Sequence, residues 1–121
     1  MKIESHRDLI VWQKSMDMVV QIYQLTNTFP STETYRITSQ ITRAAVSVPA
    51  NIAEGHARGG SKNDYAHFLA ISKGSLMETE TFLMLAVRLN YLTPDQANPT
   101  LCLITEISKM LTSLRYRILK S

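Results

Sequence analysis

The sequence predicts an all-α protein, an antiparallel up-down-up-down four-helix bundle, and three observations lead to it. Apolar residues recur every three or four positions, as on a helix face, rather than alternating as on a strand. Turn and cap residues divide the chain into four long segments. The connections are short, so consecutive helices must be antiparallel neighbours. We therefore expect residues 1–121 to form a single domain.

The first helix is expected to begin near Ser5 or Asp8 and to end by Phe29-Pro30. Its apolar residues follow a strict 3-4-3-4 spacing, which is typical of a stripe that faces the core of a bundle. This stripe comprises Leu9, Trp12, Met16, Val19 and Tyr23.

The second helix is expected to start at Ser31, a favoured N-cap residue with Glu33 in the first turn, and to stop at Gly55. Pro49 lacks an amide hydrogen and crowds the carbonyl four residues before it, so we expect a kink in the second helix at Pro49. The predicted core face comprises Ile37, Ile41, Ala44, Ala45, Val48 and Ile52.

The third helix is expected to start at Ser61, with Asp64 completing a capping-box-like pattern, and to end near Asn90 in the left-handed conformation. Thr93-Pro94 then caps the fourth helix, and Pro99 is expected to delay its regular part by a turn. The predicted core residues of the third helix are Tyr65, Phe68, Leu69, Leu76, Phe82, Leu83 and Leu89. Those of the fourth helix are Leu101, Ile104, Ser108, Leu111 and Ile118.

The apolar surface exceeds what one bundle can bury. At 100° per residue, Val11, Met18, Ile22 and Leu25 widen the apolar arc of the first helix to about 220°. The third helix carries further apolar residues away from its core stripe, at Met77, Met84 and Leu85. The second helix adds a face of small neutral residues, namely Thr38, Ser39, Thr42, Val46, Ala50 and Ala53. We expect homo-oligomerisation through these outer faces; the alternative is ordinary scattered surface hydrophobicity.

A narrow polar stripe also follows the second helix, within an arc of about 80°. It comprises Arg36, Gln40, Arg43, Ser47, Asn51 and Glu54. One interpretation is a solvated surface. The other is a seam between subunits, in which Arg43 pairs with Glu54 or with a third-helix carboxylate, Glu78 or Glu80, and fixes the register of assembly.

The net charge of +3 comes from 13 basic and 10 acidic residues and permits an anionic partner. His56, Arg58 and Lys62 surround the amide-rich start of the third helix, where a phosphate can bind, within the loop expected from His56 to Gly60. The alternative is a flexible cap whose charges are solvated. A second cluster at the C-terminus, with Arg115, Arg117 and Lys120, suits a phosphate backbone or simply complements the carbonyl end of the last helix.

The sequence gives no support for an enzyme, a metal site or a cofactor. No arginine precedes a histidine by four to six residues, as a nuclease of this kind would require. The paired Glu-x-x-His motifs of di-metal bundles are missing, and Gly59-Gly60-Ser61-Lys62 lacks the rest of a phosphate-binding loop. We expect no catalytic, cofactor-binding or metal-ligating residues.

The single cysteine, Cys102, excludes an intramolecular disulfide and fits a reducing compartment; its apolar neighbours predict a small core residue. Residues 1–8 carry charges that a signal peptide lacks, and the densest apolar run, 82–87, is far shorter than a membrane span. We expect a cytoplasmic protein without a membrane partner.

Several blocks of the sequence, spread over about residues 7–118, follow a recognisable pattern. They are Trp12-Gln13-Lys14, Phe29-Pro30, residues 40–55, Arg58, Phe68-Leu69, residues 73–80 and Tyr91-Leu92. This pattern resembles the bacterial four-helix-bundle family named after proteins encoded in intervening sequences of large-subunit ribosomal RNA genes. The resemblance implies a cytoplasmic bundle that assembles as a ring, a homopentamer. It also implies distant kinship to the accessory protein of diversity-generating retroelements, which binds nucleic acid and a reverse transcriptase.

The resemblance implies no established biochemical activity. With the surface features above, it favours a non-enzymatic, homo-oligomeric helical adaptor, pentameric by resemblance, whose basic surfaces contact RNA or a protein that handles nucleic acid. The alternative is a purely protein-binding scaffold with no role in nucleic-acid binding.

Overall fold

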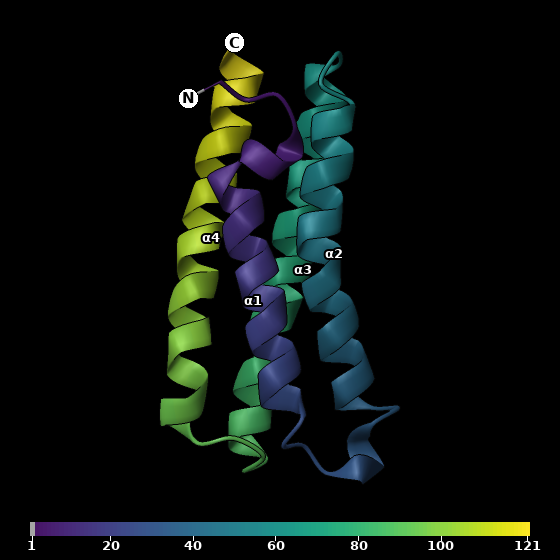
Figure 1. The fold of residues 1–121 in the computed structure, drawn as a ribbon, viewed down its shortest axis with the longest axis vertical. Coiled ribbons are helices and arrows are strands. Elements are labelled where there is room, and N and C mark those ends of the chain that lie inside the picture. The colour runs from purple at the N-terminus through teal and green to yellow at the C-terminus, as the bar shows by residue number, and fades with distance from the viewer. Residues whose placement is uncertain (1) are drawn as a thin grey trace.

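The computed structural model describes residues 2–121 as a four-helix bundle; Met1 lies outside the described residues. Neighbouring helices run in opposite directions, and the N-terminal segment lies beside the C-terminus at one end of the bundle (Figure 1). This confirms the predicted up-down-up-down bundle. The elements are η1 (His6–Asp8), α1 (Ile10–Thr26), η2 (Ser31–Glu33), α2 (Ile37–Ala57), α3 (Lys62–Arg88) and α4 (Pro94–Lys120).

The core lies along the axis of the bundle, where each helix packs against the two neighbours that precede and follow it around the bundle. The most extensive contact joins α2 to α3. Each fully buried Ile or Leu contributes about 1.5–3 kcal/mol relative to exposure. The largest fully buried side chains are Met18, Ile22, Ile41, Val48, Ile52, Leu69, Leu76, Thr79, Leu83, Ile104, Ile107 and Leu111.

The helix α1 presents a different face to the core from the one that the sequence predicted. Its buried residues are Val11, Ser15, Met18, Ile22 and Thr26. Met16 and Tyr23, from the predicted stripe, are instead 42% and 50% exposed. Polar contacts with α4 hold this orientation, because the Thr100 hydroxyl donates to Gln21 at 2.7 Å and Lys14 pairs with Glu106 at 2.8 Å.

The helix α2 starts later and ends later than predicted. Ser31 and Glu33 lie in the separate turn η2, and α2 begins only at Ile37, after the irregular backbone of Arg36 (φ −116°, ψ −116°). Its core face is as predicted. It runs without a break through Pro49, where the predicted kink stays a prediction, and ends at Ala57 rather than at Gly55.

The N-terminal caps of α3 and α4 and the end of α3 follow the sequence signals. The Ser61 hydroxyl accepts from the amide of Asp64 at 3.3 Å, and Asn90 has a positive φ of 63°. At the start of α4, the Gln96 side chain accepts from the backbone amide of Thr93, and the Thr93 hydroxyl accepts from the backbone amide of Gln96. The expected delay at Pro99 is wrong, because α4 runs continuously from Pro94.

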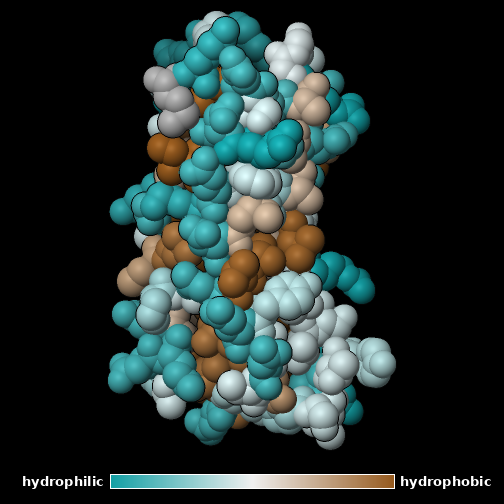
Figure 2. Space-filling view, in the orientation of Figure 1, coloured by the Kyte–Doolittle hydropathy of each residue, from teal (hydrophilic) through white to brown (hydrophobic). Residues whose placement is uncertain are grey.

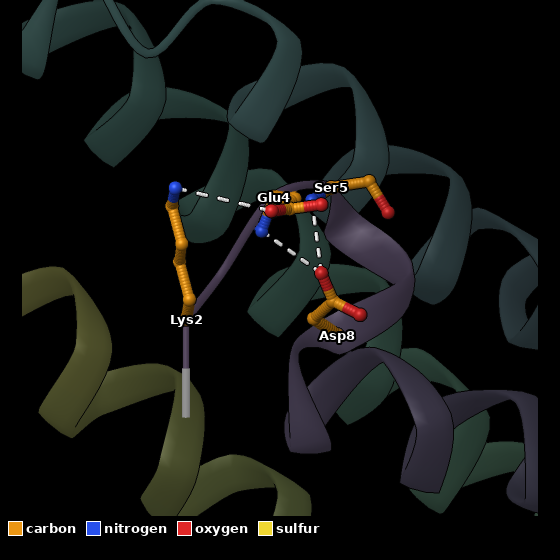
Figure 3. Close-up of polar contacts among 4 residues, drawn as sticks. All are labelled: Lys2, Glu4, Ser5 and Asp8. Atoms are coloured by element: carbon orange, nitrogen blue, oxygen red, sulfur yellow. Dashed lines mark hydrogen bonds and ion pairs between the residues drawn. The ribbon is translucent and has the colours of Figure 1, made fainter.

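The expected cap at Ser5 belongs to the short turn η1 rather than to α1. The carboxylate of Asp8 accepts hydrogen bonds from the amides of Glu4 and Ser5, at 2.8 and 3.1 Å (Figure 3). These two bonds stabilise the charged form, so they lower the pKa of Asp8 below its ordinary value. The turn therefore gains stability from Asp8 above the ordinary carboxyl pKa and loses it as the pH falls through the lowered value. Leu9, in an extended conformation, separates η1 from α1.

Cys102 is exposed on α4, so its predicted place in the core is wrong. Within residues 2–121, no helix combines the length and the apolar character that crossing a membrane requires.

Small side chains let α2 and α3 approach each other closely. The buried Ser72 hydroxyl donates to the carbonyl of Val48 at 2.8 Å, and Ser75 donates to the Ser47 hydroxyl at 2.9 Å. Gly55 lies inside α2, where an added Cβ would lie 3.0 Å from the Cβ of Phe68. Gly55 is therefore a packing residue rather than the stop signal that the sequence predicted.

The two helical glycines give a matched test of this packing. We expect Gly55→Ala to lower the free energy of unfolding by about 1–3 kcal/mol, because its Cβ meets Phe68 and the Tyr65 carbonyl in a closely packed seam. In Gly74→Ala the added Cβ has no neighbour within 4 Å. This change should raise the free energy of unfolding by about 0.5–1 kcal/mol, because alanine has the higher helix propensity. Urea unfolding followed by circular dichroism, at one protein concentration, compares them. Equal effects of the two changes would contradict the close packing at Gly55.

Candidate functional site

A polar groove of about 480 Å³ lies between α2 and α3. It brings together four residues of the predicted subunit seam, namely Gln40, Arg43, Ser47 and Glu78. Tyr35, which is 94% exposed, and Phe82 also line this groove. Four of the predicted seam residues therefore line one groove, and the choice between a solvated surface and a subunit seam stays a prediction.

The other members of the predicted seam make contacts within α2 and its preceding turn. Glu54 pairs with Arg58 at 2.9 Å, and Arg36 lies 3.9 Å from Glu33. The Asn51 amide donates to the backbone oxygen and the hydroxyl of Ser47, both at 2.8 Å. Glu54 thus has a partner within its own helix.

Arg43 and Glu78 differ from these residues, because both line the groove and neither makes an ion pair within residues 2–121. The groove therefore offers one cation and one anion to a molecule outside the chain. A surface of this kind suits a polar protein partner, including a second copy of the chain, better than it suits a polyanion.

The two predicted basic clusters meet at the same end of the bundle. Figure 1 shows the end of α2, the start of α3 and the end of α4 at the end of the bundle that also carries both termini. Arg115 links α4 to the start of α3, because its Nε donates to the Ala66 carbonyl at 3.1 Å. We call this end of the molecule the basic end.

The charges are distributed unevenly along the bundle. Dividing each helix at its midpoint places residues 2–17, 48–74 and 108–121 in the half with the basic end. This half holds ten of the 13 basic and five of the 10 acidic residues, a net charge of +5, and the other half carries −2. The modest net charge of the chain therefore conceals a strong polarity.

The α2–α3 connection is shorter than the loop predicted from His56 to Gly60, because α2 continues to Ala57. His56 is still helical, and its ring meets Tyr65 edge-on with 5.9 Å between centroids. Arg58 pairs with Glu54 and lies 4.9 Å from the centroid of the Phe68 ring. Lys62 is exposed at the start of α3. Arg58 is thus partly neutralised, whereas Lys62 has no ion-pair partner in the described chain.

The C-terminal cluster also divides into distinct environments. Arg115 and Arg117 have no ion-pair partner within residues 2–121, and Arg117 is exposed. Lys120 lies with its ammonium 5.4 Å from the centroid of the Tyr116 ring. This cluster carries more uncompensated charge than the α2–α3 connection.

Two residues of the basic end, Lys73 and Tyr116, were not predicted from the sequence. Lys73 donates to the Thr112 hydroxyl at 2.7 Å, and it lines a groove of about 470 Å³ between α3 and α4 together with Arg115 and Tyr116. Lys73 is a single lysine in the middle of a long helix, so no local pattern marks it. Tyr116 lies between Arg115 and Arg117 in the sequence. An aromatic residue flanked by cations could have indicated a nucleic-acid contact.

Large apolar side chains are exposed on both sides of α2. On α1 they are Met16, Val20 and Tyr23, with exposures of 42%, 55% and 50%. On the α2 side of α3 they are Leu85 and Leu89, with exposures of 41% and 45%, so the predicted place of Leu89 in the core is wrong. We call these two sets the α1 surface and the α3 surface.

The positions of the two surfaces follow from their neighbours. The polar side of α1 contacts α4, so its apolar strip turns toward α2. Phe82 of α3 lines the groove shared with α2, and Leu85 and Leu89 follow it on the same side of α3. Figure 2 shows hydrophobic side chains gathered in a band over α1 and the neighbouring part of α2.

The described part of the chain contains no group of three or more His, Cys, Asp or Glu side chains that could hold a metal ion. The surface features described above are the grooves on either side of α3, the two apolar surfaces and the basic end.

The comparisons with known proteins agree with this architecture. The family model of the 23S rRNA-intervening sequence protein matches residues 7–113. The chain is similar to a protein of unknown function from the S23 ribosomal protein family of Bacteroides thetaiotaomicron VPI-5482, whose crystal structure was solved at 1.70 Å resolution. The two share 31% identity with a TM-score of 0.80, over 88% of this chain and 98% of that one. No curated protein matches the sequence.

Proposed function

From the premise that this chain belongs to the 23S rRNA-intervening sequence protein family, we propose that it is a non-enzymatic adaptor that assembles with copies of itself and binds RNA. In this proposal the assembly is a ring of five copies in the cytoplasm. The ring contacts RNA through the basic ends of its bundles.

The observation that carries the assembly is the pair of apolar surfaces. The α1 surface and the α3 surface lie on either side of α2, and both expose large apolar side chains of the kind that mark contact surfaces. Two different surfaces on one subunit favour a head-to-tail contact, in which the α1 surface of one copy meets the α3 surface of the next. Repetition of such a contact generates a ring when the rotation closes.

The polar groove between α2 and α3 supports the same arrangement. It adjoins the α3 surface through Phe82, and its Arg43 and Glu78 lack partners within residues 2–121. Charged pairs at the margin of an apolar contact fix its register more than they increase its strength. The number of five subunits rests on the family resemblance.

RNA binding is supported by the charge polarity of the bundle. A net charge of +5 on the half with the basic end attracts a polyanion, and the −2 on the other half does not. Phosphate contacts by lysine and arginine supply most of the affinity for nucleic acid that does not depend on sequence. A protein that handles nucleic acid is the alternative partner, and a scaffold without nucleic-acid binding is the alternative function.

The head-to-tail contact can be tested with two complementary variants. Val20→Asp disrupts the α1 surface and Leu85→Asp disrupts the α3 surface; both positions are exposed in the single chain, so each variant should fold. We expect each variant alone to be a monomer in sedimentation velocity at micromolar concentration. Their equimolar mixture should form dimers, because each variant retains the surface that the other lacks.

The matched control is Asn98→Asp, which adds the same charge on the exposed side of α4 and should assemble like the unmodified chain. A monomeric unmodified chain would contradict the assembly. If the contact joined two α1 surfaces instead, Leu85→Asp would remain associated, which contradicts the head-to-tail arrangement.

RNA binding should depend on salt and on the basic end. The double variant Lys62→Gln, Arg117→Gln removes two unpaired exposed cations from the basic end. We expect it to weaken binding to a structured RNA and to flatten the slope of log affinity against log salt by about 2. Filter binding over a range of salt concentrations measures both effects.

The control double variant is Arg36→Gln, Arg88→Gln, which removes the same charge from the other half of the bundle and should leave the slope unchanged. If the unmodified chain does not bind RNA at low salt, the RNA proposal is wrong. The protein-binding scaffold is then the better account.

A further inference from the structure

We propose that the groove between α3 and α4 at the basic end is a binding site for single-stranded RNA, with a base stacked on Tyr116 and a phosphate held by Lys73 and Arg115. This inference rests on the proposed function and deepens it, because it names the form of RNA and the residues that recognise it.

The groove has the size and lining of a ligand site. Its volume of about 470 Å³ lies within the usual range for small-molecule pockets. Its floor is apolar, formed by Leu69, Met77 and Leu111, and Gly74 leaves one wall open because a Cβ there would meet nothing within 4 Å. No acidic side chain lines it.

Lys73 and Arg115 each form a hydrogen bond between α3 and α4, in opposite directions. Lys73 of α3 donates to the Thr112 hydroxyl of α4 at 2.7 Å, and the Nε of Arg115 on α4 donates to the Ala66 carbonyl of α3 at 3.1 Å. Each tether uses one N–H, so the remaining donors of the ammonium and the guanidinium are left for a ligand. Both cations are therefore positioned before the ligand arrives.

Neither cation is neutralised by the chain. Within residues 2–121, no carboxylate lies within ion-pair distance of Lys73 or Arg115. Charge-assisted hydrogen bonds to phosphate oxygens are among the stronger polar contacts that proteins make, and arginine can make two in parallel. An anion with several oxygens therefore matches this pair, and phosphate in a nucleic-acid backbone is such an anion.

Tyr116 distinguishes a single strand from a duplex. Its side chain is 62% exposed, it lines the same groove as the two cations, and the Lys120 ammonium lies 5.4 Å from its ring centroid. Aromatic side chains beside a positively charged groove stack on successive bases of single strands. In a duplex the faces of the bases are already stacked on each other, so a duplex gains only the phosphate contacts.

The test compares single-stranded and duplex RNA of the same sequence, each fluorescein-labelled and about 12 nucleotides or base pairs long, by fluorescence anisotropy with the full chain. We expect Tyr116→Leu to weaken single-strand binding about tenfold, the usual loss of one stacked base, and to leave duplex affinity within about twofold. Tyr116→Phe keeps the ring and should bind like the unmodified chain. Arg115→Gln should weaken both forms and flatten the salt slope by about 1.

The control is His67→Leu, which removes another exposed aromatic ring of α3 that lines neither groove and should leave both affinities unchanged. Circular dichroism and sedimentation confirm that each variant folds and assembles. Equal losses for single strand and duplex with Tyr116→Leu, or a loss of single-strand affinity with His67→Leu equal to that with Tyr116→Leu, overturn the inference. So does a change in assembly with no change in RNA affinity, which would make the groove a contact between subunits.

The two levels of the proposal fail differently. If the unmodified chain binds neither form of RNA, the proposed RNA-binding function fails, and this inference fails with it. If it binds RNA with a strong salt dependence but Tyr116→Leu has no effect, only the stacking site is wrong.

Discussion

The close contact between α2 and α3 is the constraint on which the rest of the bundle depends. It requires small or hydroxyl-bearing residues where the two backbones meet, and Gly55, Ser72 and Ser75 meet this requirement. Once these two helices share a seam, α1 and α4 close the core from the other side. The rotation of α1 that buries Ser15 and Thr26 leaves the bulkier Tyr23 outside, on the apolar α1 surface.

Local signals in the sequence were sufficient to predict the four helices, the caps at Ser61 and Thr93, the left-handed Asn90 and the core face of α2. The orientation of α1 was not predictable in this way. Its apolar arc covers about 220°, so several rotations bury similar area. The observed rotation depends on polar contacts with Thr100 and Glu106, which are distant in sequence. Gly55 and Pro99 were wrongly predicted to interrupt helices. Glycine and proline often mark helix ends, but the local sequence does not show whether they lie inside a longer helix.

For the candidate site, the sequence identified most of the charged residues but not their arrangement. The cluster around Lys62 and the cluster around Arg117 are far apart in the chain, and the alternation of helix direction places them at one end. Gln40, Arg43, Ser47 and Glu78 do share one groove as predicted neighbours would, whereas Glu54 pairs locally with Arg58. The groove with Tyr116 and Lys73 could not be predicted from the sequence, because these residues come from two different helices and no local pattern connects them.

Apart from Met16, the residues of the two apolar surfaces lie in the half of the bundle opposite the basic end. Val20 and Leu85 lie in the half with net charge −2, whereas Lys73 and Arg115 lie in the half with +5. In the proposed ring, with its axis along the bundles, side-by-side contacts place every basic end on the same face. The mutual repulsion of these ends opposes assembly, and bound RNA would neutralise it. In this proposal RNA binding and assembly favour each other by thermodynamic linkage: bound RNA reduces the repulsion between subunits, and the clustered basic ends attract RNA more strongly than one end does. Several sites on one face also convert weak single contacts into a stronger multivalent one.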